Sequence, residues 1–280
     1  MKKSWIFIPG NKERYLEKSK ELESDILIFD LEDSVVPNEK VTARFMVKKC
    51  IDYIESQPEK YVRVNEISSL FFMEDVKELV NRNLDGIVVP KVNNADEMKI
   101  VDYIISQAER EKGLEIGSVK VVPLLETGEG ITNAACIASS IERVELLAFG
   151  SEDYMLDVNI PKDAYGALQY ARSALVNASS AAGIASPIDS IYPDFNNTDG
   201  LLEASKKSRG IGFQGRLVIH PAQLKTVNDI YAPTSTEIQE AQKIVDAYDS
   251  SFDEGRGALV VDGKMIDAPV AERAKKLLEM

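Results

Sequence analysis

The chain has few of the residues that bind soft metals or form disulfides: two cysteines, Cys50 and Cys136, and one histidine, His220, in 280 residues. Two cysteines are too few for a disulfide framework, and we expect a protein of a reducing compartment, the cytoplasm. A soft-metal site needs a cluster of Cys and His side chains. The composition therefore gives no support to a zinc centre or to a disulfide-stapled fold.

Positive charge is also scarce, because 33 Lys and Arg stand against 46 Asp and Glu and leave a net charge of −13. Nucleic acids and anionic membrane surfaces attract proteins through a cationic footprint. The charge balance thus argues against both as partners. A small anionic substrate remains compatible with it, provided that local cations bind the substrate.

Long apolar runs and linker tracts are missing as well. No segment is apolar over the length that a bilayer requires, and MKKSWIFIPGNKER has too few apolar residues before Pro9 and Gly10 for a signal peptide. The hydrophobic share of 44% and the charged share of 28% are typical of a globular protein. We expect one large domain, residues 1–233, followed by a C-terminal extension, residues 234–280.

Eight short apolar segments recur along the chain, with helical, charged segments between them. Val/Ile/Leu-rich strands separated by amphipathic helices are typical of a parallel sheet covered by helices, and eight of them predict a closed (β/α)8 TIM barrel. The alternative, a doubly wound open sheet, would carry a glycine-rich phosphate turn after its first strand, where FIPGNKER has one glycine. The expected strands are residues 4–10, 25–33, 61–66, 85–92, 119–127, 144–153, 186–194 and 215–221.

The extension predicts a helix, a hairpin and a second helix. PTSTEIQEAQKIVDAY is helical from near Thr236, and GALVVDGKMIDAPV predicts a hairpin that turns at Asp262 and Gly263. Pro269 is placed to begin the last helix.

Polar residues occupy the expected strand ends, where catalysis takes place in a barrel of this kind. In LIFDLEDSV an apolar run is followed by three carboxylates, whose repulsion and desolvation must be offset by a metal, by basic partners or by water. Together these side chains predict a site for a divalent cation and an anion. They are Asp30, Glu32, Asp33, Arg63, Asn65, Lys91, Glu126, Glu152, Asp153 and His220.

Glu126 and Asp153 follow neighbouring strands and are the candidate metal ligands. Two carboxylates, with the other positions left to water and substrate oxygens, suit Mg²⁺, and Mn²⁺ is an alternative. The competing interpretation of Glu126 is a strand-end carboxylate that pairs with a nearby lysine.

Arg63, in YVRVN, alternates with Val62 and Val64 and would enter the acidic mouth. Its planar fork can hold a substrate carboxylate bidentately; the alternative is a salt bridge to Asp30 or Glu32 alone. Of the three carboxylates in DLEDSV, we expect one to orient Arg63 or a metal-bound water, and one to lie at the N-terminus of the following helix.

Lys91 and His220 are weaker candidates. A Schiff-base lysine needs a depressed pKa, whereas the surrounding carboxylates should keep the pKa of Lys91 high, so we interpret it as an electrostatic partner in substrate binding. His220, in VIHP, is more readily explained as a packing residue than as a catalytic one.

Eight motifs in order resemble the citrate lyase β-subunit-like proteins of the HpcH/HpaI aldolase superfamily: SWIFIPGNKERY, DLEDSV, VRVN, VVPKV, LLETGEG, FGSEDY, IHPAQ and DGKMIDAP. The resemblance implies a TIM-type barrel, trimeric or hexameric, that acts with Mg²⁺ on acyl-CoA or acyl-carrier-protein thioesters. It also implies that Glu126 and Asp153 bind the metal, that Arg63 holds a keto-acid carboxylate, and that Asp267 serves a neighbouring subunit's active site.

The chain departs from the family pattern at two places. Lys3 stands where the family often has Arg, and the family's ETA is Glu126, Thr127 and Gly128 here, with a further acid at Glu129. Gly128 loosens the loop beside the metal and Glu129 adds negative charge where an anionic substrate must enter, so both concern the choice of substrate more than the chemistry.

The predicted activity is cleavage or formation of a 3-hydroxy-acyl thioester of the citryl-, malyl- or citramalyl-CoA type, which releases a keto acid and an acyl thioester. Arg63 and the metal would stabilise the developing charge, and Glu32, Asp33 and Asp267 are the candidate catalytic carboxylates. Asp30 and Lys91 would assist substrate binding. The alternatives are a keto-acid aldolase, an acyl-CoA thioesterase and a non-catalytic subunit that binds acyl thioesters.

Overall fold

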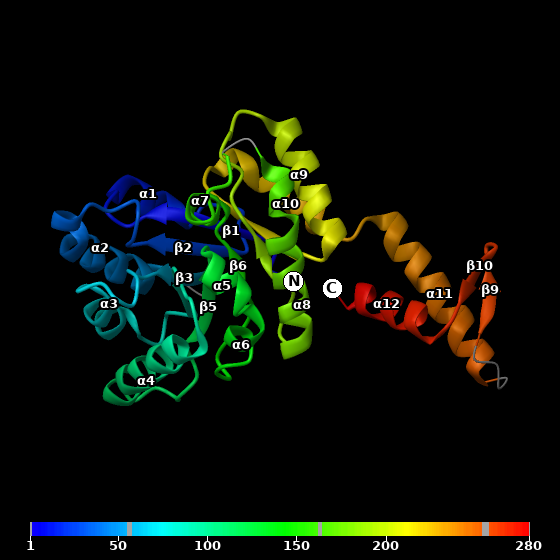
Figure 1. Ribbon diagram of the computed structural model, residues 1–280, viewed down its shortest axis with the longest axis horizontal. Coiled ribbons are helices and arrows are strands. Elements are labelled where there is room, and N and C mark those ends of the chain that lie inside the picture. The colour runs from blue at the N-terminus through cyan, green and yellow to red at the C-terminus, as the bar shows by residue number, and fades with distance from the viewer. Residues whose placement is uncertain (1, 55–57, 162–163, 254–257, 280) are drawn as a thin grey trace. The chain divides into compact units, whose positions relative to one another are not determined.

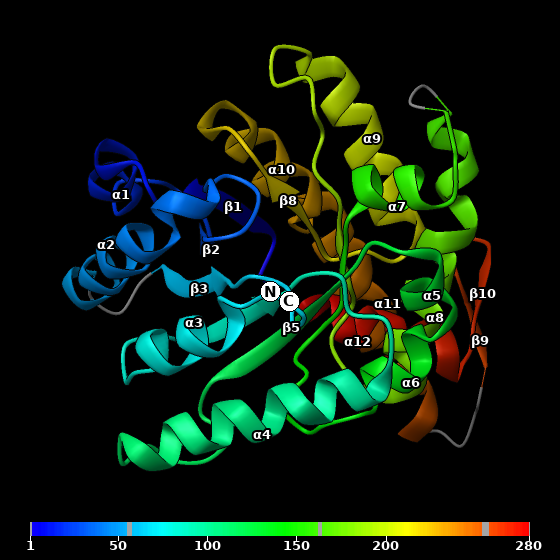
Figure 2. The same cartoon turned by 60° about the vertical axis from the view of Figure 1, so that its left-hand side comes forward.

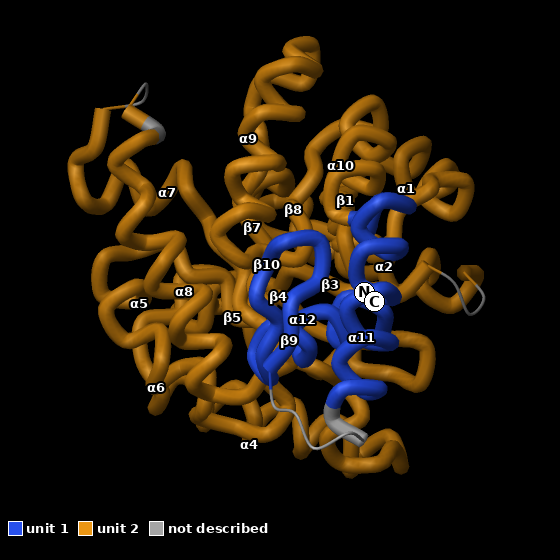
Figure 3. Tube along the Cα trace, turned by 90° about the vertical axis from the view of Figure 1, so that its right-hand side faces the viewer, with its two compact units in different colours: residues 1, 232–280 blue, residues 2–231 orange. Residues whose placement is uncertain are grey.

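The computed structural model describes residues 2–54, 58–161, 164–253 and 258–279. The chain divides into two compact units, Lys2–Tyr231 and Ala232–Met280, which Figure 3 shows in different colours. Figure 1 labels their helices and strands. Among the described residues, no helix has both the length and the apolar character needed to cross a membrane.

The first unit is a closed barrel of parallel strands, which confirms the predicted (β/α)8 fold (Figure 2). Each strand pairs with the next along the chain, and β8 closes against β1 with Ser4 opposite Arg216. The strands are β1 (Ser4–Pro9), β2 (Ile26–Asp30), β3 (Glu59–Arg63), β4 (Gly86–Val89), β5 (Lys120–Leu125), β6 (Ala148–Phe149), β7 (Ile188–Asp189) and β8 (Gly215–Val218).

Helices follow the strands and cover the outside of the barrel (Figure 3). They are α1 (Glu13–Ser19), α2 (Lys40–Tyr53), α3 (Phe72–Leu79), α4 (Ala95–Glu111), α5 (Gly128–Thr132), α6 (Ala134–Ala138), α7 (Ser151–Asp157), α8 (Gln169–Ala182), α9 (Thr198–Ile211) and α10 (Leu224–Tyr231), with short 3-10 turns η1 (Pro37–Glu39), η2 (Tyr165–Leu168) and η3 (Pro221–Gln223).

All eight strands are shorter than the sequence predicted, and two of them are reduced to two residues each. The expected strand 144–153 is reduced to β6, and Ser151, Glu152 and Asp153 belong instead to the first turn of α7. Acidic residues are favourable there because the N-terminus of a helix carries partial positive charge. The expected strand 186–194 is likewise reduced to β7.

Alternating strand positions separate two hydrophobic cores. One cluster takes a residue from every strand region, among them Trp5, Ile28, Tyr61, Leu124 and Leu217, and therefore fills the barrel interior. A larger cluster takes the intervening positions and packs with the helices. Because side chains alternate along a strand, the interior positions continue to the mouth of the barrel.

The second unit contains α11 (Ser235–Asp253), β9 (Leu259–Val261), β10 (Lys264–Ile266) and α12 (Ala268–Leu278). The two strands pair antiparallel and confirm the predicted hairpin. Asp262 and Gly263 both adopt positive φ, 49° and 76°, which is what a tight type I′ turn requires and why Asp-Gly is favoured there. α12 begins one residue before the expected Pro269.

A buried ion-pair cluster joins β7 to β8 and α8. Asp189 Oδ2 accepts from Arg216 Nη2 at 2.7 Å, and Asp189 Oδ1 accepts from Arg172 Nε at 3.1 Å. Burial alone would raise the pKa of Asp189, but the charges of Arg216 and Arg172 outweigh burial and lower the pKa below its usual value. The carboxylate is therefore ionised and paired at neutral pH.

We expect Asp189→Asn to lower the free energy of unfolding by about 3–5 kcal/mol, since it leaves buried arginine charge uncompensated. The measurement is urea unfolding at pH 7, with Asp229→Asn in the exposed pair Lys225–Asp229 as a control that changes little. The pKa of Asp189 is depressed in the fold, so its contribution is present above its unfolded pKa of about 3.9 and fades as the pH falls further. An equal loss in both variants would contradict the assignment.

Candidate active site

A cavity of about 400 Å³ lies at the C-terminal ends of the barrel strands. The alternation that places Ile28 and Tyr61 in the barrel interior places Asp30 and Arg63, two residues further along, at this mouth. The cavity is lined by Phe7, Pro9, Asp30, Asp33, Ser34, Arg63, Leu124, Glu126, Gly150, Ser151, Glu152, Asp153, Ser190, Ile191, Leu217 and Ile219.

Arg63 is held by three carboxylates and one aromatic ring. Its Nε and Nη2 donate to the two oxygens of Asp30 at 2.7 Å each, while Nη1 lies 2.8 Å from Glu32 Oε2 and donates to Asp33 Oδ2 at 3.2 Å. Its Cζ lies 4.7 Å from the centre of the Phe7 ring. Burial alone would lower the pKa of Arg63, but the charge of Asp30 outweighs burial and raises it. The guanidinium is therefore charged and fixed in orientation.

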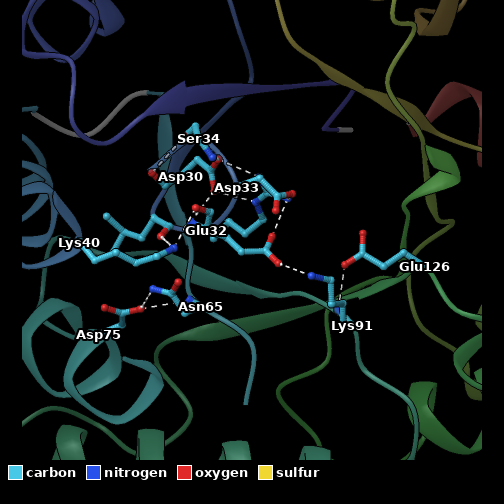
Figure 4. Close-up of polar contacts among 11 residues, drawn as sticks. Asp30, Glu32, Asp33, Ser34, Lys40, Asn65, Asp75, Lys91 and Glu126 are labelled. Atoms are coloured by element: carbon cyan, nitrogen blue, oxygen red, sulfur yellow. Dashed lines mark hydrogen bonds and ion pairs between the residues drawn. The ribbon is translucent and has the colours of Figure 1, made fainter. Parts of the chain in front are cut away.

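The loop after β2 is folded around the Asp30 carboxylate (Figure 4). Asp30 accepts from the backbone N–H groups of Glu32 at 2.9 Å and Ser34 at 3.1 Å. Lys40 Nζ donates to the carbonyls of Leu31 and Glu32, both at 2.9 Å. α2 begins only at Lys40 and has no acidic residue in its first turn. The prediction that one of the three carboxylates lies at the N-terminus of this helix was therefore wrong.

Lys91 connects Glu32 to Glu126 (Figure 4). Its Nζ lies 3.2 Å from Glu32 Oε1, and its backbone N–H donates to Glu126 Oε1 at 2.9 Å. Lys91 has a φ of 52°, a left-handed conformation that costs about 1–3 kcal/mol in a non-glycine residue and is often found at functional sites. Burial alone would lower the pKa of Lys91, but Glu32 outweighs it and the pKa is raised, as the sequence predicted.

Glu126 and Asp153 both line the cavity, from β5 and from the first turn of α7. Burial raises the pKa of Glu126 to about 8, with the charges of Glu32 and Asp153 adding to it and Arg63 opposing it. Gly150 lies directly against Glu126, because a Cβ at Gly150 would come within 2.3 Å of Glu126 Oε2. The same Cβ would lie 2.6 Å from Glu126 Cβ, so a larger residue at position 150 would displace Glu126 from its present position.

The donor set at Glu126 and Asp153 fits Mg²⁺. Glu126 is buried beside the carboxylates Glu32 and Asp153, and Glu152 Oε1 is buried without a hydrogen-bond partner among the described residues. No group of three Asp, Glu, His or Cys side chains in the described part of the chain forms a complete metal cluster. Mg²⁺ accepts two carboxylates and fills its other positions with water and substrate oxygens.

Three residues named from the sequence lie elsewhere. Asn65 donates from its backbone N–H and its Nδ2 to Asp75, at 3.1 and 2.6 Å. His220 caps η3, where its Nδ1 accepts from a backbone N–H at 3.2 Å, and its ring stacks on Phe195. Asp267 belongs to the second unit and caps α12, where Oδ1 accepts from the N–H of Val270 at 3.3 Å.

The structure also places Phe7, Ser151 and Ser190 on the cavity wall, and none of them was predicted from the sequence. Phe7 and Ser190 share the inward strand positions with Trp5 and Ile188. That alternation could have identified both of them. Ser151 had no such signal, because it lies in a helix that was expected to be a strand.

Comparison with known proteins identifies related chains. The profile of the HpcH/HpaI aldolase/citrate lyase family matches residues 3–221. Citrate lyase subunit beta of Haemophilus influenzae is 33% identical over 100% of this chain and 96% of its own length. (3S)-malyl-CoA thioesterase of Cereibacter sphaeroides is 32% identical over 95% of this chain and 89% of its own length.

A solved structure is similar over the same extent. The CitE protein of Mycobacterium tuberculosis, in complex with magnesium, acetoacetate and coenzyme A, superposes with a TM-score of 0.80. It is 25% identical, and the alignment covers 99% of this chain and 97% of that one.

We expect Glu126→Gln and Asp153→Asn each to weaken Mg²⁺ binding beyond detection while the barrel stays folded. The strands are held by apolar packing, and neutralising a carboxyl beside other acids relieves repulsion, so the metal-free variants should be at least as stable as wild type. Calorimetric titration with MgCl₂ measures the affinity, and thermal unfolding without metal measures the stability. Wild-type affinity in either variant would remove that residue from the site.

Proposed function

The chain belongs to the HpcH/HpaI aldolase/citrate lyase family of lyases, and we propose that it cleaves or forms the carbon–carbon bond of a 3-hydroxy-acyl thioester with Mg²⁺. The products of cleavage are a keto acid and a shorter acyl thioester. The observation that carries the proposal is one cavity that presents a fixed arginine fork, Arg63, and two carboxylates, Glu126 and Asp153.

Arg63 is the proposed holder of the keto-acid carboxylate. A guanidinium has five N–H groups; those of Arg63 make two hydrogen bonds to Asp30 and one to Asp33, and Nη1 also pairs with Glu32 at 2.8 Å. The Asp33 side chain is 60% exposed and makes the longest of these contacts, whereas Asp30 and Glu32 are buried. A substrate carboxylate would therefore displace Asp33 and keep the other two, which hold Arg63 in place.

In the cleavage direction a base removes the proton of the substrate hydroxyl, and the carbon–carbon bond breaks to give the keto acid and the thioester enolate. The enolate then takes a proton at carbon, so atoms and charge balance. Mg²⁺, bound by Glu126 and Asp153, would supply a Lewis acid at the keto-acid oxygens. Arg63 would fix the carboxylate and stabilise the negative charge that develops beside it.

A second cavity of about 430 Å³ offers room for the thioester carrier. It shares Phe7, Pro9 and Ile219 with the first cavity and includes Arg14 and Lys18 of α1. Both cations are exposed, and neither forms an ion pair within the ranges that the structure describes. In a chain with a net charge of −13, they would suit the phosphates of CoA or of a carrier-protein arm.

The test of the function is an assay of purified protein with malyl-, citramalyl- and citryl-CoA, with and without MgCl₂. A lyase releases a keto acid and a CoA thioester, a thioesterase releases free CoA, and a keto-acid aldolase prefers free aldehydes. Mg²⁺-dependent release of keto acid supports the proposal. Release of free CoA alone, or no turnover of any thioester, would overturn it.

We expect Arg63→Lys to lower kcat/KM by about 10- to 100-fold, because lysine keeps the charge but loses the planar fork. This corresponds to about 1.5–3 kcal/mol, the range for hydrogen bonds to charged groups. The comparison is made at saturating MgCl₂ with circular dichroism as a control for folding. Kinetics within twofold of wild type would mean that Arg63 only pairs with its acidic neighbours.

We further propose that Asp267 transfers the proton at the active site of a neighbouring chain in a homotrimer or hexamer, with residues 234–280 contributing to the assembly. Its position as the cap of α12 is compatible with this role, since capping engages one carboxylate oxygen through a 3.3 Å bond. A positioned proton-transfer group contributes about 10² to 10⁴ in rate.

The prediction is that Asp267→Asn and Glu126→Gln chains, each inactive alone, regain part of the activity when they are unfolded together and refolded as mixed oligomers. Some interfaces would then pair an intact barrel with an intact Asp267. Wild type refolded in the same way is the control, and native mass spectrometry verifies mixing. A verified mixture as inactive as its parents would refute action between chains.

A further inference from the structure

Ser190 and Ser151 form a buried hydroxyl pair on the wall of the cavity. The two oxygens lie 2.7 Å apart, and Ser190 Oγ also accepts from the backbone N–H of Ser151 at 3.0 Å. The residues are 1% and 2% exposed. The pair joins the end of β7 to the first residue of α7, although 39 residues separate them in the sequence.

α7 has no cap from its own chain segment. The first N–H groups of a helix lack partners within the helix, and a side chain of the residue before it usually accepts from one of them. Here that residue is Gly150, which has no side chain to offer. Ser, Thr, Asp or Asn here would place a Cβ 2.6 Å from Glu126 Cβ and would force Glu126 to shift.

Ser190 occupies the place of the missing cap and is itself firmly held. Its backbone carbonyl accepts from Arg216 Nη1 at 2.8 Å, and Arg216 is paired with Asp189 at 2.7 Å. The hydroxyl that reaches α7 therefore extends from a segment tied to β8. On the other side, the N–H of Gly150 donates to Leu125 O on β5 at 3.0 Å.

We propose that Ser190 is a positioning residue, which caps α7 from the neighbouring strand and so fixes Asp153, in the first turn, relative to Glu126. Crowding of Gly150 against Glu126 removes the local cap, and Ser190 replaces it. The part of this inference that concerns the metal rests on the proposed function. The capping itself does not.

The test uses Ser190→Ala, which removes both hydrogen bonds, and Ser151→Ala, which removes the hydroxyl contact but keeps the amide bond. Ser179→Ala is the matched control. Ser179 is a serine 1% exposed on α8, and its hydroxyl has no hydrogen-bond partner in the described ranges. All four proteins are compared well below their unfolding temperatures.

Hydrogen exchange of the peptide covering residues 148–157 is measured in the metal-free proteins, and calorimetric titration with MgCl₂ gives the affinity. We expect Ser190→Ala to speed exchange in this peptide and to raise the Kd for Mg²⁺ about tenfold, the lower end for groups that orient a metal ligand. Ser151→Ala should show a smaller change in the same direction. Ser179→Ala should match wild type in both.

Unchanged hydrogen exchange in Ser190→Ala would overturn the capping role. Equal effects in Ser179→Ala would mean that loss of any buried serine hydroxyl destabilises the barrel, and would overturn it as well. If exchange rises but the Kd does not, the link to Asp153 is wrong. Failure of the wild type to bind Mg²⁺ would count against the proposed function instead. Hydrogen exchange in the metal-free proteins would still show whether Ser190 caps α7.

Discussion

The double hydrogen bond between Arg63 and Asp30 is the interaction on which the mouth of the barrel depends. It places a permanent positive charge among the carboxylates of Asp30, Glu32 and Asp33, which would otherwise repel one another. Asp30 uses its remaining capacity to accept from the backbone of the loop that carries Glu32 and Asp33. One residue pair thus orients the guanidinium and folds the acidic loop.

The carboxylates at the mouth of the barrel differ in how far nearby positive charge stabilises their ionised forms. Asp30 keeps a lowered pKa because Arg63 outweighs burial, while the pKa of Glu126 rises to about 8 because burial, Glu32 and Asp153 outweigh Arg63. Arg63 therefore compensates Asp30, whereas burial raises the pKa of Glu32 as well as that of Glu126. A divalent cation bound beside Glu126 would complete the balance, in keeping with the magnesium in the related CitE structure.

The buried position of the Glu126 side chain in the cavity wall constrains the residues that contact it. Its carboxylate excludes a side chain at position 150, and glycine there deprives α7 of a cap. Lys91 meets the same carboxylate through a backbone N–H in a left-handed conformation. Such local departures from favourable backbone and capping patterns are typical of functional sites, where the surrounding fold holds them in place.

The sequence by itself determined the barrel, the hairpin at Asp262 and Gly263, and the strand ends that carry Asp30, Arg63 and Glu126. These features follow from patterns within a few residues: alternation, turn chemistry and the direction of parallel strands. It did not determine how Arg63 divides its N–H groups, that Asp153 lies on a helix, or that Ser190 reaches Ser151. Those depend on distances between segments far apart in the chain, which exist only once the barrel has closed and its side chains have packed.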